Sequence, residues 1–185
     1  MKHFIIGITG KKFNGKDTAG IYLINNYGYE RIAFADALKN ACKCIFGFTD
    51  EQLYGDKKED IDEYYGISPR KIFQYVGTEL FRNKLKEIIP FIDDKIWIHV
   101  VKKKILDKIK ENPECKIVIT DVRFENEANL IKELGGCLIK VTRNIMNITN
   151  DDHESEQQID KLYADYDISN NGTIEEMYND IKKII

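Results

Sequence analysis

The stretch GKKFNGKDT at residues 10–18 decides the fold of this chain. It fits the pattern G-x-x-x-x-G-K, whose glycines let successive backbone N–H groups curl around a phosphate. Residues 3–9 before it are apolar at nearly every position, which indicates a short strand buried on both faces. Residues 18–27 after it have helical spacing, and Gly28 is expected to end that helix. Strand, glycine loop and helix in this order predict a phosphate-binding loop (P-loop) at the start of a parallel sheet.

Strand-like and helical segments alternate along the rest of the chain. We expect further strands at residues 29–35, 116–120, 137–142 and 166–169. We expect helices that begin at Asp36 as a cap, at Ser68-Pro69 and at Thr173, and others over residues 94–110 and 126–134. Residues 49–65 are acidic and polar, and are expected to form a surface excursion with a short helix. The alternation predicts one α/β domain with a five-stranded parallel sheet flanked by helices.

The composition excludes several classes of protein. The chain has 185 residues, 43% of them hydrophobic, so it can bury a core without disulfides or a metal. Its formal net charge of −3 is unlike the basic surface of a protein bound to duplex nucleic acid, although a local phosphate site needs only a few cations. No apolar run approaches the roughly 20 residues of a membrane helix. The first residues lack a signal-peptide pattern, so we expect a cytoplasmic protein with four free thiols.

Arginine is scarce, which makes its positions informative. Of the 28 basic residues only five are Arg, as expected from an AT-rich coding bias that favours Lys wherever a generic positive charge suffices. The positions that keep Arg are then enriched for sites that need a planar, bidentate and permanently charged group. Four of the five lie in the candidate motifs described below: Arg70, Arg82, Arg123 and Arg143.

The loop itself carries the chemistry of a nucleotide phosphate site. The start of the following helix adds partial positive charge, and Lys16 is expected to reach the β- and γ-phosphate oxygens. Asp17 stands where Ser or Thr usually binds Mg²⁺, and its carboxylate can hold the ion directly or through water. Thr18 is expected to donate to the α-phosphate. The three histidines lack the spacing of zinc ligands.

Motifs along nearly the whole chain carry a specific resemblance. In chain order these are GKDT (15–18), FADALK (34–39), SPRKIFQYVGTELFR (68–82), IW (96–97), VITDVRFENEA (118–128), KVTR (140–143) and DHESE (152–156). With them the chain resembles the phage and viral deoxynucleoside monophosphate kinase family. The resemblance implies a P-loop kinase fold and transfer of the γ-phosphoryl group of ATP to a (deoxy)nucleoside monophosphate, giving the diphosphate, with Mg²⁺. An N-K-x-D motif, which GTPases use to read their base, is absent.

The expected ATP site and catalytic residues follow from these motifs. Asp121 ends the third expected strand, where a carboxylate orients Mg²⁺, unless it only caps the next turn. Arg123 is expected to offset phosphate charge, unless it forms a surface ion pair with Glu125 or Glu127. Arg143 begins an expected lid over about residues 143–156, which includes His153. The expected catalytic residues are Lys16, Asp121, Arg123 and Arg143, and the expected metal ligands are Asp17 and Asp121. The expected ATP contacts are Gly10, Lys12, Asn14, Gly15, Lys16, Asp17, Thr18, Asn170 and Gly172.

The acceptor site is expected in a helical region over about residues 36–110. Asp36 and Lys39 share a helix face, as do Arg70 and Gln74, and a guanidinium beside an amide suits a phosphate and a base edge. The expected acceptor contacts are Asp36, Lys39, Arg70, Gln74 and Arg82. The alternative for Asp36 and Lys39 is that Asp36 only caps its helix and that Lys39 is exposed to solvent. Trp97 and Phe73 either stack on a base or belong to the core.

Two other functions stay open at this point. A phosphomevalonate kinase-like enzyme shares the GKD loop, and a non-catalytic nucleotide-binding module would keep the loop without transfer activity. Retention of Arg70, Arg123 and Arg143 in a Lys-rich chain disfavours the second alternative. We expect small-molecule nucleotides as partners, without nucleic acid or membrane, in the host cytoplasm if the source is viral. The sequence leaves open whether the protein is a homodimer and which base or sugar it prefers.

Overall fold

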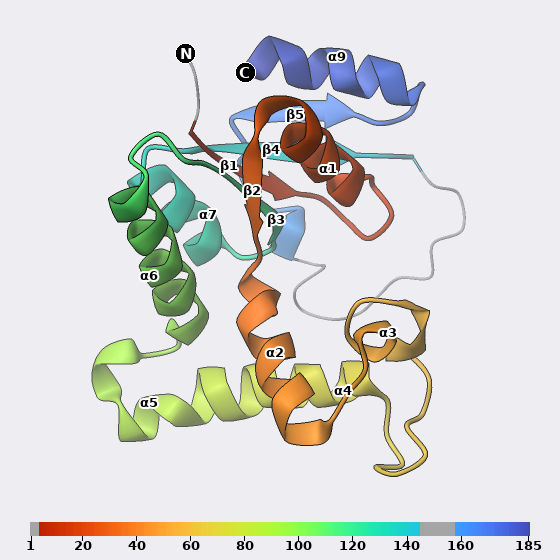
Figure 1. Ribbon diagram of the computed structural model, residues 1–185, viewed down its shortest axis with the longest axis vertical. Helices are drawn as coiled ribbons and strands as arrows, with labels where there is room; N and C mark the ends of the chain where they lie inside the picture. Colours follow the sequence, from red (N-terminus) through yellow and green to blue (C-terminus); the bar gives the residue numbers. More distant parts are fainter. Residues whose placement is uncertain (1–3, 145–157) are drawn as a thin grey trace. The chain divides into compact units, whose positions relative to one another are not determined.

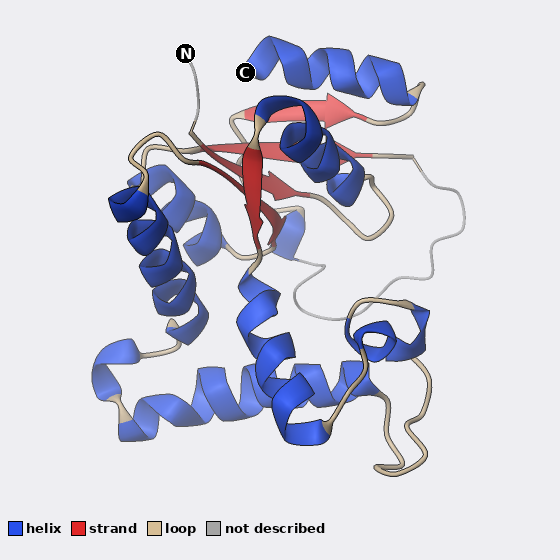
Figure 2. Cartoon of the chain, viewed as in Figure 1, coloured by secondary structure: helices blue, strands red, loops and turns tan. Residues whose placement is uncertain are grey.

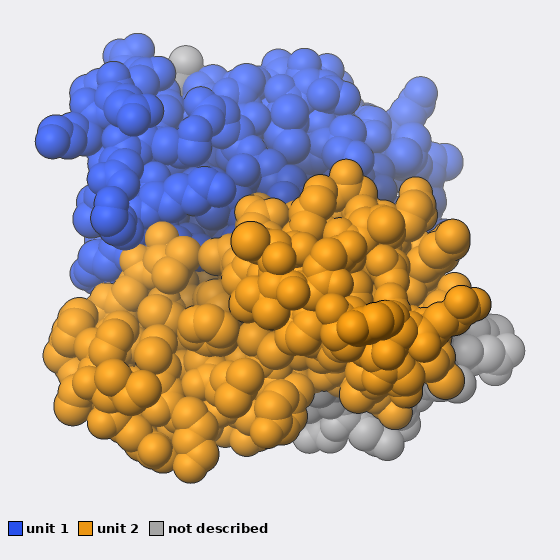
Figure 3. All heavy atoms as spheres, turned by 60° about the horizontal axis from the view of Figure 1, so that its bottom comes forward, with its two compact units in different colours: residues 1–33, 101–185 blue, residues 34–100 orange. Residues whose placement is uncertain are grey.

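The computed structural model describes residues 4–144 and 158–185 (Figure 1). The chain divides into two compact units (Figure 3), each of which is described by itself. Unit 1 comprises Met1–Ala33 and Val101–Ile185, and unit 2 comprises Phe34–Val100.

Unit 1 contains the predicted five-stranded parallel sheet, and the expected fold class is confirmed. Its strands are β1 Ile5–Thr9, β2 Tyr29–Ile32, β3 Lys116–Val122, β4 Cys137–Thr142 and β5 Tyr166–Ser169. They lie in the order β2-β3-β1-β4-β5, with β1 at the centre and all four pairings parallel. All five residues of β1 are buried, whereas the edge strands β2 and β5 are partly exposed. The central strand reads as a continuous apolar run because helices cover both of its faces.

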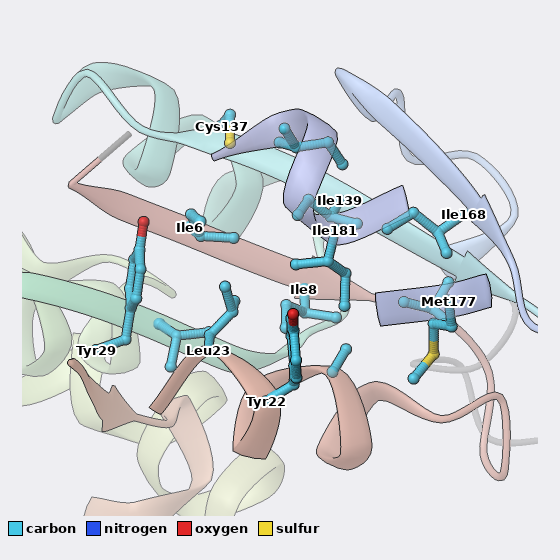
Figure 4. Packing of buried hydrophobic residues seen from close by; sticks show 14 residues of the cluster. Ile6, Ile8, Tyr22, Leu23, Tyr29, Cys137, Ile139, Ile168, Met177 and Ile181 are labelled. Atoms are coloured by element: carbon cyan, nitrogen blue, oxygen red, sulfur yellow. The ribbon is translucent and has the colours of Figure 1, made fainter. Parts of the chain in front are cut away.

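The helices of unit 1 lie on both faces of this sheet (Figure 1). They are α1 Lys16–Tyr27, α7 Glu125–Glu133, α9 Ile174–Ile184 and most of α6 Ile96–Glu111, which begins in unit 2. Ile6 and Ile8 of β1 point toward Leu23 of α1 and Ile181 of α9 in one buried cluster (Figure 4). Gly7 between them faces α7, where an added Cβ would lie 2.4 Å from Ile131 Cδ1.

Two of the predicted helix ends are confirmed in unit 1. Gly28 ends α1 with a left-handed φ of 71°, and its N–H bonds the carbonyls of Leu23 and Ile24. Thr173 caps α9 through a capping box with Glu176. α1 begins at Lys16, two residues before the predicted start, so both Lys16 and Asp17 lie in its first turn.

Unit 2 is helical and contains no strand within residues 34–100 (Figure 2). Its elements are α2 Phe34–Phe46, α3 Asp50–Leu53, η1 Asp56–Lys58, α4 Pro69–Gln74, η2 Tyr75–Lys84, α5 Leu85–Ile88, η3 Pro90–Ile92 and the start of α6. η1 and η3 are 3₁₀ turns, whereas η2 is a π-helix of ten residues that continues directly from α4. A small core holds the unit together and consists of Cys42, Phe48, Leu53, Ile72 and Val76.

Predicted boundaries of β2, α2 and β3 are wrong. β2 ends at Ile32 rather than at residue 35, and α2 already begins at Phe34. Asp36 therefore lies inside the first turn of α2 and is not its cap. Phe34 is 5% exposed, so its burial within the helical turn overrides the strand preference of the local sequence. β3 extends to Val122, so Asp121 lies within the strand rather than after it.

All four cysteines are free thiols, as predicted. Cys42, Cys115 and Cys137 are buried, and Cys44 is exposed. Within the described part of the chain, every helix is too short or too polar to cross a membrane.

Candidate active site

The loop between β1 and α1 has the curled backbone that the motif predicts. Left-handed φ angles occur at Gly10 (146°), Phe13 (67°) and Gly15 (101°). A Cβ on Gly10 would come within 2.3 Å of the Val141 carbonyl oxygen, and one on Gly15 within 2.4 Å of Asn170 Nδ2. Both glycines are therefore required by their backbone angle and by the closeness of their neighbours.

Two asparagine side chains fasten this loop to the sheet. Asn14 is 6% exposed, and its Nδ2 donates to the Val141 carbonyl of β4 at 3.0 Å. Asn170, which directly follows β5, donates from its Nδ2 to the Asn14 carbonyl at 2.9 Å. The sequence predicts ATP contacts for both residues, and their side-chain amides are used to hold the loop in shape.

Three lysines surround the loop. The Lys16 ammonium donates to the Lys11 carbonyl at 2.8 Å, across the mouth of the loop. Lys11 also pairs with Asp160 at 2.8 Å, and the Lys12 ammonium lies 5.1 Å from the centre of the Phe13 ring. Because the start of α1 adds partial positive charge at the same place, this loop suits a polyphosphate.

The two expected metal ligands belong to neighbouring parts of unit 1. Asp17 is exposed in the first turn of α1, and Asp121 is half-buried near the end of β3. β3 pairs directly with β1, and Val122 lies in register with Thr9, the last residue before the loop. Parallel strands of one sheet end at the same edge, so both carboxylates belong to the edge at which the loop begins.

The donor set at this edge fits Mg²⁺. This ion commonly takes one or two carboxylates and completes its shell with water and substrate phosphates. Among residues 4–144 and 158–185, no group of three or more His, Cys, Asp or Glu side chains forms a self-sufficient metal cage. Asp17 and Asp121 are two carboxylates of the kind that this ion takes, and they stay the expected ligands.

Glu127 is a site residue that sequence reasoning missed. It is 3% exposed, and its Oε2 accepts the backbone N–H groups of Arg123 at 2.8 Å and Phe124 at 3.2 Å. The sequence suggests Glu127 only as a surface ion-pair partner for Arg123. Its position in the first turn of α7 is the capping-box position for Glu, which is the signal that identifies such a role. The buried carboxylate fixes the turn that carries Arg123.

The turn after β5 lies beside the end of β4. The backbone N–H of Asn170 donates to the Thr142 carbonyl at 2.7 Å, and the Asn144 N–H donates to Asn171 Oδ1 at 2.6 Å. Arg143 is exposed between these two bonds. Gly172 accommodates the Glu176 carboxylate, which an added Cβ would meet at 1.9 Å. Most of the expected lid, including His153, lies outside the described residues.

The five expected acceptor residues all belong to unit 2. Asp36 and Lys39 lie on α2, and the Lys39 ammonium lies 4.3 Å from the centre of the Tyr54 ring. Arg70 is the second residue of α4 and pairs with Glu59 at 3.1 Å. Gln74 ends α4, half-buried, and Arg82 lies on η2 with its Nε fully buried. In contrast, all expected ATP, metal and catalytic residues belong to unit 1.

Trp97 and Phe73 both pack against other side chains of unit 2. Trp97 is 9% exposed, its indole Nε1 donates to the Gly77 carbonyl at 3.0 Å, and its ring lies 5.4 Å from that of Phe81. Phe73 packs edge-on against Phe48 at 5.8 Å. Trp97 is thus a buried core residue, and Phe73 is half-buried against the core of unit 2.

The chain is similar in sequence to proteins of known family. The family model for deoxynucleotide monophosphate kinase matches residues 52–181. A putative deoxynucleotide monophosphate kinase of Acanthamoeba polyphaga mimivirus is 45% identical over 183 residues, which cover 96% of this chain and 93% of that protein. The deoxynucleoside-5'-monophosphate kinase of Escherichia phage T5 is 34% identical over 126 residues, covering 65% of this chain and 46% of the longer phage protein.

Solved structures share the fold. TT1252 from Thermus thermophilus superimposes with a TM-score of 0.52 at 17% identity, covering 99% of this chain and 97% of that one. A dephospho-CoA kinase from Campylobacter jejuni gives 0.51 at 17% identity, covering 98% and 94%. The fold is therefore that of P-loop kinases. With the fastened loop, the Asp121–Glu127 segment and the viral relative together, this chain belongs to the deoxynucleotide monophosphate kinase family.

Proposed function

We propose that this kinase transfers the γ-phosphoryl group of ATP to a deoxynucleoside monophosphate, with unit 1 holding ATP and unit 2 holding the acceptor. Family membership supports the reaction. The observation that carries the proposal is the loop after β1, held open by Asn14 and Asn170 with Lys16 at the start of α1. Such a loop serves the phosphates of a nucleotide.

In this proposal the loop N–H groups and Lys16 bind the β- and γ-phosphates of ATP. Lys16 exchanges the Lys11 carbonyl for phosphate oxygens, which is a short movement for a flexible side chain. Its charge lies close to oxygens whose charge shifts during transfer, so it stabilises the transition state more than the bound substrate. Thr18, in the first turn of α1, donates to the α-phosphate.

Asp17 and Asp121 would hold Mg²⁺ at this edge of the sheet. When bound, Mg²⁺ neutralises phosphate charge and keeps the β- and γ-phosphates in a defined orientation. Asp17 approaches from the helix that follows β1, and Asp121 from the strand beside β1.

Two arginines of unit 1, Arg123 and Arg143, offset the charge of two facing phosphates. Arg123 extends from a turn that the buried Glu127 carboxylate holds, so its backbone is fixed before the substrates bind. Arg143, exposed after β4, supplies a second guanidinium. Phosphoryl transfer through a loose transition state depends on positioning and charge, so a strong general base is not needed.

The acceptor monophosphate binds to the Arg and Lys side chains of unit 2. Arg70 grips two phosphate oxygens with its planar fork after leaving Glu59, and Lys39 and Arg82 add charge. Gln74 reads a base edge, and Asp36 binds the sugar or orients the acceptor. We further propose that the enzyme acts on free nucleotides in the host cytoplasm, without nucleic acid or membrane.

An assay of ADP release with a panel of acceptors tests this function. The purified chain is incubated with ATP, Mg²⁺ and each dNMP or NMP in turn, and phosphomevalonate serves as the control acceptor. We expect ADP release that depends on at least one dNMP. Release that depends on phosphomevalonate alone would make the enzyme a kinase of another phosphate ester. ATP binding without any acceptor-dependent release would make it a non-catalytic nucleotide-binding module.

A further inference from the structure

Phe13, in the loop between β1 and α1, has an unusual backbone conformation for its residue type. Its φ angle is 67°, in the left-handed region. A bulky side chain is rare in that region, because its Cβ comes too close to the following carbonyl oxygen. Among the described residues Asp93 is the other non-glycine residue with a positive φ, and a short Asp side chain tolerates this conformation better. Phe13 therefore holds a conformation that Gly would adopt without steric cost.

The turn that contains Phe13 explains why the backbone needs this angle. The Asn14 N–H donates to the Lys11 carbonyl at 3.2 Å, so residues 11–14 form a turn in which Phe13 is the third residue. A positive φ at the third residue of a turn ordinarily selects Gly or Asn. A left-handed residue in such a loop also helps successive N–H groups to point at an anion. The backbone of Phe13 thus serves phosphate binding, and this purpose does not require its side chain.

The side chain of Phe13 is also unfavourably placed for stability. Phe13 is 64% exposed, and the Lys12 ammonium lies 5.1 Å from the centre of its ring. A ring that stays largely in water contributes little of the free energy that burial of a Phe would give. Neither the backbone angle nor packing therefore favours Phe over Gly at this position. A residue that is unfavourable on both counts indicates that the ring has a function.

The position of the turn indicates what the ring can act on. The Lys16 ammonium, which we assign to the β- and γ-phosphates, donates to the Lys11 carbonyl at 2.8 Å. Lys11 is the first residue of the turn, so the turn lies beside the place proposed for the γ-phosphate. Phe13, two residues further along the same turn, belongs to that side of the loop. Water and the acceptor compete for the phosphoryl group at this place.

We propose that the Phe13 ring shields the γ-phosphate of bound ATP from water. This inference rests on the proposed function of the loop as the ATP phosphate site. In hydrolysis a water oxygen bonds to the γ-phosphorus and the bond to the β–γ bridging oxygen breaks. ADP keeps the electron pair of that bond, and a proton of the water passes to solvent, giving ADP and inorganic phosphate. An apolar ring beside the γ-phosphate excludes water from the attacking position, whereas Gly leaves room for it.

The Phe13→Gly variant tests this proposal, because Gly keeps the backbone angle and removes the ring. Release of inorganic phosphate from ATP without acceptor should rise about 10-fold, since attack by water is no longer obstructed. The KM for the dNMP should stay unchanged. The melting temperature should stay the same or rise by up to about 4 °C, because Gly suits a positive φ. Phe13→Leu keeps the apolar bulk and should release phosphate as slowly as the wild type.

Tyr163 provides a matched control within unit 1. It is 78% exposed, and the Lys132 ammonium lies 4.9 Å from the centre of its ring, so it is also an exposed aromatic residue beside a lysine. Tyr163 precedes β5, whereas Phe13 follows β1. The strands are parallel, so these two residues belong to opposite edges of the sheet. Tyr163→Gly should therefore release phosphate at the rate of the wild type.

Assays of inorganic phosphate and of the dNDP product distinguish this inference from the proposed function. If the wild type converts a dNMP to the dNDP and Phe13→Gly releases no additional phosphate, the inference fails and the function stands. If the wild type forms no dNDP with any dNMP, the proposed function fails, whatever the phosphate release. A Phe13→Leu variant that releases as much phosphate as Phe13→Gly, or a Phe13→Gly variant with a lower melting temperature, would overturn the shielding role.

Discussion

Among single residues, Lys16 gives the most direct test of the phosphate loop. Its side chain lies outside the buried core and donates to a loop carbonyl, so Lys16→Ala should leave the fold intact and strongly reduce transfer. Several kcal/mol of transition-state stabilisation are at stake, roughly 10²- to 10³-fold in kcat. ADP release and thermal unfolding, monitored by circular dichroism, check the two expectations. Lys11→Ala, which removes an exposed ion pair in the same loop, is the control and should lose little. Near-normal turnover of Lys16→Ala would contradict the proposal that this loop binds the phosphates of ATP.

The carboxylates Asp17 and Asp121 predict a dependence on Mg²⁺. Asp17→Ala and Asp121→Ala should each raise the Mg²⁺ concentration needed for half-maximal rate. Asp17 is exposed in the first turn of α1 and Asp121 is half-buried, so we expect the larger shift for Asp17→Ala if its carboxylate contacts the ion directly. Titration of the initial rate with Mg²⁺ at saturating ATP measures both shifts. The reverse order would assign the direct contact to Asp121.

Arg70 tests the hypothesis that the few arginines of this chain lie where a bidentate guanidinium is needed. Arg70→Lys keeps the charge but loses the bidentate fork, so kcat/KM for the dNMP should fall roughly 5- to 150-fold, as for loss of a charge-assisted hydrogen bond of about 1–3 kcal/mol. The KM for ATP should hardly change. Glu59→Gln is the matched control, because it removes the partner of Arg70 in the structure. If Arg70 serves only that exposed ion pair, the two variants should behave alike and both should be nearly silent.

At the scale of elements, the loop depends on the turn after β5. Asn170→Ala would leave the buried Asn14 carbonyl without the 2.9 Å bond that holds the loop against β4 and β5. We expect a loss of about 1–2 kcal/mol in the free energy of unfolding and a higher KM for ATP, with the acceptor KM unchanged. Denaturant unfolding and steady-state kinetics measure these effects. Asn179→Ala, an exposed change on α9, should alter neither quantity. A stable variant with an unchanged KM for ATP would show that the loop keeps its shape without Asn170.

For the whole molecule, the burial of the thiols predicts their reactivity. Burial raises the pKa of Cys42 to about 11 and that of Cys137 to about 12, so both remain protonated at pH 8, where only the thiolate reacts. Cys115 is buried as well, and Cys44 is exposed. A thiol reagent at pH 8 should therefore label one cysteine per native chain quickly and all four after unfolding. Fast labelling of two or more in the native protein would contradict the packing of the unit that holds the additional labelled cysteine.

Residues close together in the sequence were enough to predict several elements of unit 1. The glycines of the loop, the apolar run of β1, the Gly28 stop and the Thr173 cap each depend on residues within a few positions, so they could be predicted. Family motifs added the site residues, and the arginine scarcity singled out four positions.

Only the tertiary structure decided features that join distant parts of the chain. One such feature is the strand order of the sheet. Another is the hydrogen bond from Asn170 to the Asn14 carbonyl, which joins residues 156 positions apart. A third is the hydrogen bond from Trp97 to the Gly77 carbonyl, which joins residues 20 positions apart. The early start of α2 follows from the burial of Phe34, and α4 continues as the π-helix η2 without a break. Hydrophobic periodicity does not encode such choices, because the free energy that decides them comes from contacts formed only when the elements pack together.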